Sequence, residues 1–478
     1  MQALGHLGHL WRSQRWSASR LEASQLRLVQ ERVWEAAERV PLYREAFARE
    51  GLGAANIRSL SDFRRFPIVT KEAVKSHFPD GIVMEHTRWD RLYANATSGT
   101  TDRVIVFQDD EKRNWDRAAD LLLQLQGNGF RPGHRSLTLP PDACYEHCGA
   151  DGRMVTYSVR DTVRDLWRAA PEQRLQLRRR LRSAVLRDYL WREKRLGSLG
   201  VDGTRASKEI LDEYCSEIRK WKPQVLRGLP VTLYVLAKHA QRIGFVPHGL
   251  RSIRPNGGKF TQAMVQTVEE AFAARVRENY GTAELGTVAF DCARSRQQHL
   301  LGDLFYIEFL RRGEPVGPGE LGEMVVTDLR NRATPLIRYA VGDVGRYATG
   351  KCECGFEGLR FSVEGRLEET IVTPDGHVIS GAQVTDLFLA RPEIEHVKVT
   401  QLQENSFMVE TVLAPDAKAH PDEAELAADL SSLLQSEVEV RLRVVRGIAP
   451  ERSGKYRLVV GSSHGRFHQP VSNLVNCS

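Results

Sequence analysis

Short apolar runs separated by glycine and proline constrain the fold of this 478-residue chain more than any other feature. Between residues 305 and 347, runs of strand length alternate with turn residues. These turn residues are Gly313, Gly317, Pro318, Gly319 and Gly322. Helical and strand patterns alternate up to about residue 290, and the tail from about residue 367 alternates strand, helix (422–435) and strand. We therefore expect an α/β protein with a large N-terminal domain of sheets and helices, residues 1–366, and a small C-terminal α+β domain, residues 367–478.

Start and stop signals predict a helical N-terminal region. An amphipathic first helix is predicted from an apolar stripe at Leu10, Leu21, Leu26 and Leu28. The first 21 residues contain three arginines and no acid, a composition that also resembles a transit peptide. Pro41 predicts a break in a helical stretch at 20–50, and Thr70 can cap a helix that begins at Lys71.

The positive charge of the chain is concentrated in one segment. The chain has 68 Lys and Arg against 61 Asp and Glu, and residues 160–195 hold 12 basic and 5 acidic side chains, which is the whole excess of +7. Apolar residues at helical spacing (Leu177, Leu181, Val185 and Tyr189 or Leu190) predict a solvated, arginine-rich helix there. Contact with an acidic carrier protein, with CoA phosphates or with an anionic membrane surface is the functional alternative. Because no nucleic-acid-binding module accompanies the segment, we expect no nucleic acid partner.

Composition narrows the class of protein and its compartment. Apolar residues make up 41% of the chain and charged residues 27%, which excludes a disordered or low-complexity protein. No apolar run approaches the roughly 18 residues of a transmembrane segment. The seven cysteines are an odd number in a chain without a secretory signal. We therefore expect no disulfide framework and a cytoplasmic location.

A loop of small hydroxyl residues lies between two predicted strands near residue 100. It consists of Thr97, Ser98, Gly99, Thr100 and Thr101. Backbone N–H groups and hydroxyls in such a loop can surround phosphate oxygens. The Gly-Lys-Ser/Thr of a Walker loop is absent, and taken alone the segment also fits an ordinary polar turn.

Four further motifs follow along the chain. Tyr280 and Gly281 precede Glu284, an arrangement in which an aromatic ring can stack on a base and a carboxylate can hold Mg²⁺. Asp343 follows a glycine and can accept hydrogen bonds from ribose hydroxyls. Arg366 follows Gly365, and Lys455 follows Gly454 near the C-terminus. Each motif alone is also compatible with a turn or a solvated loop.

In this order and spacing, the five motifs resemble the adenylate-forming acyl-CoA synthetase superfamily. Within it, the chain resembles the phenylacetate–CoA ligase and coenzyme F390 synthetase-like branch, with supporting segments at 40–44, 66–71 and 222–228. The resemblance spans about residues 30–460. It implies a mobile C-terminal domain that acts as a lid.

The resemblance also implies a role for each motif residue. The β- and γ-phosphates of ATP would be held by Thr97, Ser98, Gly99, Thr100 and Thr101. The adenine side would be lined by Gly257 and Gly258, and Tyr280 would pack near adenine or the acyl substrate. Gly281 and Thr282 would also contact the nucleotide, and the ribose would be bound by Asp343. Lys455, Glu284 and Arg366 would act in catalysis, Glu284 by holding Mg²⁺ and Lys455 by reaching the forming acyl phosphate. Glu368 would be the hinge, where the family usually has Asp.

The chain departs from the family pattern at two positions of the nucleotide motifs. Asp102 stands where the phosphate loop usually has glycine, and it places a negative charge beside the phosphates. Ala283 replaces the usual hydroxyl residue before Glu284. Because Glu284, Asp343 and Lys455 are retained, the enzyme interpretation is favoured.

Cysteines and one histidine predict a structural zinc site. Cys352 and Cys354 form a Cys-x-Cys pair in the β-rich region, and Cys292 and His299 lie upstream. Two strands and a Cys-x-Cys turn can bring together a Cys₃His set, which is typical of structural zinc. The alternative is a set of reduced cysteines in turns. A second candidate set is Cys144, His147 and Cys148, although a loop near the acyl pocket fits that segment equally well.

These observations together predict an ATP- and Mg²⁺-dependent enzyme. It would adenylate an organic carboxylic acid, with aromatic acids among the candidates, release pyrophosphate and pass the acyl group to a thiol, in the first instance that of CoA. An alternative retains the adenylation but transfers the acyl group to an amine or to a carrier-protein thiol. A third hypothesis is a non-catalytic relative that binds an acidic partner, for which Asp102 and Ala283 are the support.

Overall fold

The computed structural model of the chain divides into two compact units. Unit 1 takes its residues from 1–127, 278–381 and 461–478, and unit 2 from 128–277 and 382–460. The structure describes residues 2–96, 103–127, 131, 133–139, 159–170, 174, 177–178, 181, 185, 192–196, 208–373, 377–449, 451 and 456–461. The expected division after residue 366 stays a prediction.

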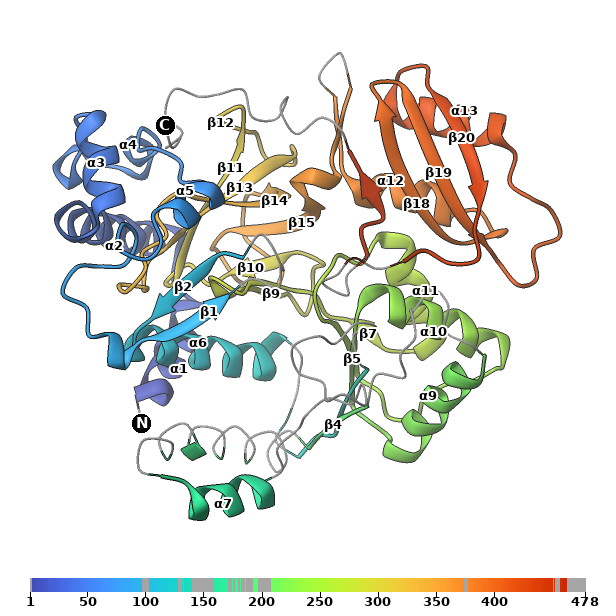
Figure 1. Ribbon diagram of the computed structural model, residues 1–478, viewed down its shortest axis with the longest axis horizontal. Helices are drawn as coiled ribbons and strands as arrows, with labels where there is room; N and C mark the ends of the chain where they lie inside the picture. Colours follow the sequence, from blue (N-terminus) through green and yellow to red (C-terminus); the bar gives the residue numbers. More distant parts are fainter. Residues whose placement is uncertain are drawn as a thin grey trace. The chain divides into compact units, whose positions relative to one another are not determined.

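Helices α1 to α6 of unit 1 all come from residues 1–127 and are drawn in blue and cyan in Figure 1. They are α1 (Gln2–Ser13), α2 (Ala18–Arg39), α3 (Pro41–Arg49), α4 (Leu60–Phe63), α5 (Lys71–Ser76) and α6 (Asp110–Leu122). Short helical turns are η1 (Ala54–Asn56), η2 (Trp89–Arg91), η3 (Leu123–Gly127) and η6 (Leu367–Glu369). Ser17 caps α2 by accepting the N–H of Arg20, so the predicted first helix is in fact two helices. The break at Pro41 and the Thr70 cap of α5 are confirmed.

An antiparallel sheet of eight strands forms the centre of unit 1, in the order β12-β11-β13-β14-β15-β10-β9-β8. Its strands are β8 (Asn279–Thr282), β9 (Gly286–Asp291), β10 (Gln298–Leu300), β11 (Phe305–Arg311), β12 (Glu314–Pro315), β13 (Gly322–Asp328), β14 (Tyr339–Ala348) and β15 (Arg360–Arg366). Two hairpins accompany it: β1 (Tyr93–Ala96) with β2 (Ile105–Gln108), and β16 (Ile371–Val372) with β17 (Val378–Ile379). The strand-rich character predicted for 305–347 is therefore confirmed.

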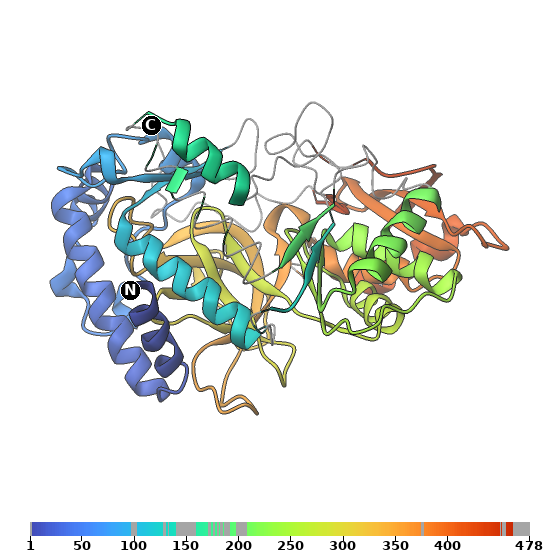
Figure 2. The ribbon, with the colours of Figure 1, turned by 90° about the horizontal axis from the view of Figure 1, so that it is seen from below.

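The hydrophobic core of unit 1 lies between this sheet and the N-terminal helices. Buried apolar side chains of α2, α3 and α6 pack with those of β9, β11, β13 and β14. Helix α1 lies alongside α6 (Figure 2), and His6 stacks on Trp115 with ring centroids 3.9 Å apart. Burial of this apolar surface is the main stabilising term, at about 25 cal/mol per Å². It also fixes α6 against the sheet.

Unit 2 contains a parallel sheet and a smaller mixed sheet. The parallel sheet has the order β4-β3-β5-β6-β7, and the mixed sheet has the order β20-β19-β18-β21. The strands are β3 (Ser136–Thr138), β4 (Glu193–Arg195), β5 (Val225–Gly228), β6 (Ser252–Pro255), β7 (Arg275–Val276), β18 (Ile394–Gln403), β19 (Ser406–Leu413), β20 (Glu439–Val444) and β21 (Val459–Val460). The helices are α7 (Val159–Arg168), α9 (Lys208–Trp221), α10 (Pro230–Arg242), α11 (Gln262–Phe272), α12 (Gly381–Leu389) and α13 (Glu423–Leu434). The strand–helix–strand pattern predicted for the tail is confirmed.

Polar contacts join residues 382–460 of unit 2 to its helices α10 and α11. Asp386 on α12 accepts hydrogen bonds from the first two N–H groups of α11, those of Gln262 at 3.0 Å and Ala263 at 2.9 Å. Glu395 on β18 pairs with Arg242 at 2.6 Å and Lys238 at 3.3 Å, both on α10. Charged side chains of 382–460 therefore contact α10 and α11. Among the described residues, no helix has the length and apolar character needed to cross a membrane.

Candidate functional site

Three predicted site residues meet where β14 and β15 pair. Asp343 on β14 lies opposite Arg366 on β15, and Arg366 Nη1 donates a hydrogen bond to Asp343 Oδ1 at 2.7 Å. The hydroxyl of Tyr280 on β8 donates to the other oxygen, Asp343 Oδ2, at 2.8 Å. Asp343 and Tyr280 are buried, whereas the Arg366 side chain is 44% exposed. The result is one polar cluster with a guanidinium group accessible to solvent.

The charges in this cluster set which groups donate and which accept. Burial and the negative charge of Asp343 raise the pKa of Tyr280 well above its usual value, so the phenol keeps its proton and donates. Asp343 likewise raises the pKa of Arg366. Each oxygen of a carboxylate has about two lone-pair sites, so Asp343 can accept more hydrogen bonds than these two. A pair of neighbouring hydroxyls, such as those of a ribose, fits this acceptor.

Glycines shape the backbone on both strands. Gly342 and Gly365 have φ of +75° and +131°, a region that glycine adopts much more readily than other residues. A Cβ on Gly342 would also lie 3.3 Å from Nζ of Lys71. The residue just before Asp343, and the one just before Arg366, are therefore glycine for a conformational reason.

Glu284 lies in the turn between β8 and β9. Its side chain is buried, and its Oε1 accepts a hydrogen bond from the hydroxyl of Tyr339 at 3.3 Å. Within the turn, Leu285 N–H donates to Thr282 Oγ1 at 3.3 Å. A Cβ on Gly281 would lie 2.4 Å from the carbonyl oxygen of Gly286, so this hairpin excludes any larger residue there. The turn thus holds a buried carboxylate in a fixed place.

The other nucleotide residues fall in different parts of the chain. Gly257 and Gly258 follow β6 in unit 2, with φ of +69° and +75°. The hydroxyl loop of Thr97, Ser98, Gly99, Thr100 and Thr101 lies outside the described residues, as do Asp102 and Lys455. The strands predicted beside the hydroxyl loop are present as the hairpin β1–β2. The binding roles of all these residues stay predictions.

The predicted hinge residue, Glu368, lies in the turn η6 directly after Arg366. Its carbonyl oxygen accepts the N–H of Gly461 at 3.2 Å, so residues from two distant points of the chain meet at this turn. The backbone N–H of Arg366 donates to Glu369 Oε2 at 3.3 Å. The hinge role itself stays a prediction.

The predicted Cys₃His set is brought together at one end of the large sheet. The ligand atoms of Cys292, His299, Cys352 and Cys354 all lie within 4.8 Å of one another. The sulfurs of Cys292 and Cys352 are 3.6 Å apart, and Cys354 Sγ is 3.8 Å from His299 Nε2. With Zn–S bonds of about 2.3 Å, tetrahedral geometry places two sulfurs about 3.8 Å apart. The spacing therefore fits a four-coordinate metal.

The surroundings of the cluster favour the metal-binding forms of Cys352 and His299, whereas burial raises the pKa of the Cys354 thiol to about 11. Burial raises the pKa of the Cys352 thiol, but hydrogen bonds with its neighbours together lower it by more. The net effect is a pKa lowered to about 7. Burial lowers the pKa of His299 to about 4, which leaves the imidazole neutral at pH 7. Phe356 stacks on His299 with ring centroids 4.1 Å apart. The stacked Phe356 therefore helps to fix the orientation of the imidazole ring.

Sequence reasoning missed several polar residues that support the turn of Glu284. Tyr339 donates to Glu284, and Lys112 forms a buried ion-pair cluster with Asp116 and Asp328 behind the turn. Only the spacing of Lys112 and Asp116, four residues apart on a helix, is a local signal of this cluster. Its contact with Asp328 depends on the fold.

Comparisons with known proteins identify ligases to which this chain is similar. A family model described as the CapK C-terminal domain matches residues 371–462. The phenylacetate–coenzyme A ligase of Thermus thermophilus is 23% identical over 403 residues, covering 82% of this chain and 78% of that protein. The phenylacetate–coenzyme A ligase of Aromatoleum evansii is 24% identical over 451 residues, covering 90% of each chain.

The same likeness extends to three-dimensional structure. A crystal structure of 2-hydroxyisobutyryl-CoA ligase in the postadenylation state superposes with a TM-score of 0.69 at 18% identity, covering 95% of this chain and 92% of that one. The fold is therefore that of the adenylate-forming CoA ligases. With ligase relatives along most of its length, the chain is similar in sequence to phenylacetate–coenzyme A ligases and in fold to the adenylate-forming CoA ligases.

Proposed function

We propose that this protein activates an organic carboxylic acid with ATP, forming an acyl adenylate and pyrophosphate, and then transfers the acyl group to the thiol of coenzyme A. The observation that carries the proposal is the cluster of Tyr280, Asp343 and Arg366, in which a buried carboxylate lies beside an accessible guanidinium. The phenylacetate–coenzyme A ligases among its relatives support the same reaction.

In the first step, a carboxylate oxygen of the acid attacks the α-phosphorus of ATP. The bond from that phosphorus to the bridging oxygen breaks, and pyrophosphate leaves with the electron pair. Such a step needs mainly positioning and neutralisation of charge. Asp343 would accept hydrogen bonds from the ribose hydroxyls, and the exposed N–H groups of Arg366 would face the α-phosphate. The hydroxyl loop at 97–101 and Lys455 would contact the remaining phosphate oxygens and the acyl phosphate.

Magnesium would be held at Glu284. A carboxylate oxygen is the ligand type that Mg²⁺ prefers, and the turn of Glu284 is fixed by the hydroxyl of Tyr339. When bound, the ion would neutralise charge on the phosphates. Glu284 would be the ion's protein ligand, and water molecules would fill other positions, since Mg²⁺ usually keeps several water ligands.

In the second step, the sulfur of coenzyme A attacks the acyl carbonyl, the thiol proton is lost and AMP leaves. A mobile C-terminal domain would remove Lys455 from the site so that the thiol can enter. An ATP–pyrophosphate exchange assay over a panel of acids, aromatic acids first, tests the adenylation. Acyl-CoA formation, followed by chromatography, tests the acceptor.

Each outcome of these assays has a clear meaning. Exchange without acyl-CoA would favour transfer to an amine or a carrier-protein thiol. No exchange and no ATP binding with any acid would favour a non-catalytic relative that binds an acidic partner.

We also propose that Cys292, His299, Cys352 and Cys354 hold a structural zinc ion. The distances of 3.6 and 3.8 Å within the set support it, as does the chemistry of three thiols and an imidazole. A site with four protein ligands has no open position, so the ion would stabilise the fold without joining the reaction. Zinc would link the end of β9 with β10 and with the turn after β14.

A further inference from the structure

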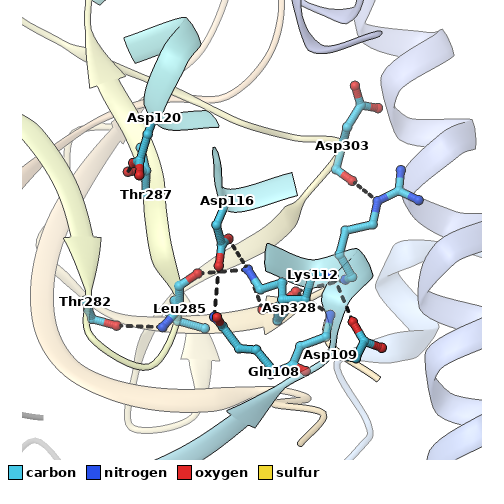
Figure 3. Close-up of polar contacts among 12 residues, drawn as sticks. Gln108, Asp109, Lys112, Asp116, Asp120, Thr282, Leu285, Thr287, Asp303 and Asp328 are labelled. Carbon is cyan, nitrogen blue, oxygen red and sulfur yellow. Dashed lines mark hydrogen bonds and ion pairs between the residues drawn. The ribbon is translucent and has the colours of Figure 1, made fainter. Parts of the chain in front are cut away.

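A charged cluster contacts Leu285, the residue that follows Glu284 (Figure 3). Lys112 on α6 is fully buried, and its Nζ lies 2.8 Å from Asp116 Oδ1, 3.1 Å from Asp328 Oδ2 and 2.9 Å from the carbonyl oxygen of Leu285. An ammonium group has three N–H donors, and three acceptors surround this one. The residue directly after Glu284 is therefore tied to α6 by its backbone.

The same face of α6 follows the turn residue by residue. Lys112 binds the carbonyl of Leu285, and four residues later the Asp116 carboxylate packs on Gly286, where a Cβ would lie 3.0 Å from Oδ1. Another four residues on, Asp120 Oδ1 accepts the hydroxyl of Thr287 at 2.6 Å. Side chains spaced by four residues lie on one face of a helix, so α6 acts as a rigid support for this turn.

The cluster also connects the turn to the hairpin β1–β2. Gln108, the last residue of β2, donates from Nε2 to Asp116 Oδ2 at 2.9 Å. Asp116 therefore bridges Gln108 on one side and Lys112 on the other. The hydroxyl loop at 97–101 is the connection within this hairpin. A chain of short contacts thus runs from the strand after that loop to the residue after Glu284.

We propose that Lys112 is a positioning residue that sets Glu284 relative to the β1–β2 hairpin, and so aligns the Mg²⁺ ligand with the phosphates of ATP. The inference rests on the proposed function of Glu284. A buried ion pair is weak evidence of added stability, because desolvation offsets the attraction between the charges. Asp328 is itself fixed, since its Oδ1 accepts the N–H groups of Arg330 and Asn331. The geometry therefore points to a role of Lys112 in aligning the turn of Glu284 rather than in stabilising the fold.

The test uses Lys112→Met in the full chain, with Arg32→Met as the matched control. Arg32 is also a buried cation in ion pairs, with Glu31 and Glu35, but on α2. Binding of Mn²⁺ with ATP is measured by electron paramagnetic resonance, and the Mg²⁺ dependence of pyrophosphate exchange is measured in parallel. We expect Lys112→Met to raise two metal midpoints about tenfold: the Mn²⁺ concentration at half-maximal binding and the Mg²⁺ concentration at half-maximal exchange. Tenfold is the lower end of the loss in metal affinity that follows changes next to a metal ligand. Arg32→Met should lower thermal stability and leave both midpoints unchanged.

A second variant decides the matter if Lys112→Met does not fold. Gly286→Ala removes no charge, but its Cβ at φ +81° would push the turn away from Asp116, so the same increase in the Mn²⁺ midpoint is expected. The inference would be overturned if folded Lys112→Met bound Mn²⁺ as the wild-type chain does. If Lys112→Met does not fold, the same result in Gly286→Ala would overturn it. The proposed function would still hold in either case, provided that the wild-type chain catalyses pyrophosphate exchange. A wild-type chain without exchange and without Mn²⁺–ATP binding would overturn the proposed function, and the inference with it.

Discussion

Removing one hydroxyl group tests how Asp343 is prepared for a ribose. Tyr280→Phe deletes the group that donates to Asp343 Oδ2 at 2.8 Å and keeps the ring, which packs edge-on against Phe361 with centroids 5.9 Å apart. A buried hydrogen bond to a charged group contributes about 1.5–3 kcal/mol. In this variant Asp343 keeps its 2.7 Å contact with Arg366, and without the Tyr280 hydroxyl its carboxylate is expected to turn toward Arg366. If half of that energy, about 0.75–1.5 kcal/mol, is lost from ATP binding, the KM for ATP rises about three- to tenfold, since 1.4 kcal/mol is a factor of ten.

Steady-state pyrophosphate exchange at varied ATP concentration measures this change. Tyr347→Phe is the control, because Tyr347 lies on the same strand as Asp343 but donates to the carbonyl of Val316 at 3.1 Å. We expect this control to lose about 1 kcal/mol of stability, the typical value of a neutral hydrogen bond, and to keep the wild-type KM for ATP.

Two results would refute the reasoning about Asp343. One is a folded Tyr280→Phe variant with an unchanged KM for ATP, which would show that the hydroxyl does not prepare the carboxylate. The other is an equal rise of KM in Tyr347→Phe, which would trace the effect to general loosening of the sheet.

Three further predictions concern other parts of the chain. Metal analysis should find about one zinc per chain, which Cys354→Ser should lose and Cys215→Ser, outside the cluster, should keep; equal zinc contents would contradict the site. Burial, with a smaller contribution from Lys238, lowers the pKa of His396 to about 4, so its neutral form is favoured in the folded protein. The free energy of unfolding should then fall by roughly 3 kcal/mol as the pH drops from about 6.5 to about 4, and His396→Phe should flatten this dependence in urea titrations; an unaltered pH dependence in the variant would exclude His396 as its source. Lys455→Ala should abolish pyrophosphate exchange yet spare acylation of CoA from supplied acyl adenylate, and loss of both activities would reject a lysine used only in the first step.

Short-range signals predicted those parts of the fold in which side chain and backbone interact within one turn. Thr70, the predicted cap, accepts the N–H of Ala73 at the start of α5, and the helix predicted at 422–435 is present as α13. The cysteine set is also predictable, because a Cys-x-Cys turn needs only strand pairing to meet its partners. That pairing is present, since β10 lies between β9 and β15.

Contacts between distant segments could not be predicted in this way. Lys112 and the carbonyl of Leu285 are 173 residues apart, and no local pattern says which buried acids surround an isolated lysine. The hydrogen bond from Tyr339 to Glu284 could not be predicted for the same reason, because the sequence around Tyr339 indicates only an ordinary strand residue. The first helix was predicted as continuous because apolar periodicity runs through residues 10–28, but the hydrogen bond accepted by Ser17 begins a new helix.

The contacts of Asp386 and Glu395 have a consequence for detachment of the C-terminal segment. Asp386 accepts two N–H groups of α11, and Thr261 independently accepts a third, that of Met264. If residues 382–460 were pulled away, water could solvate the released amides and the carboxylates while Thr261 kept the helix capped. Arg242 would likewise exchange Glu395 for water. These attachments are therefore of a kind that can open and re-form many times without unwinding the helix beneath them.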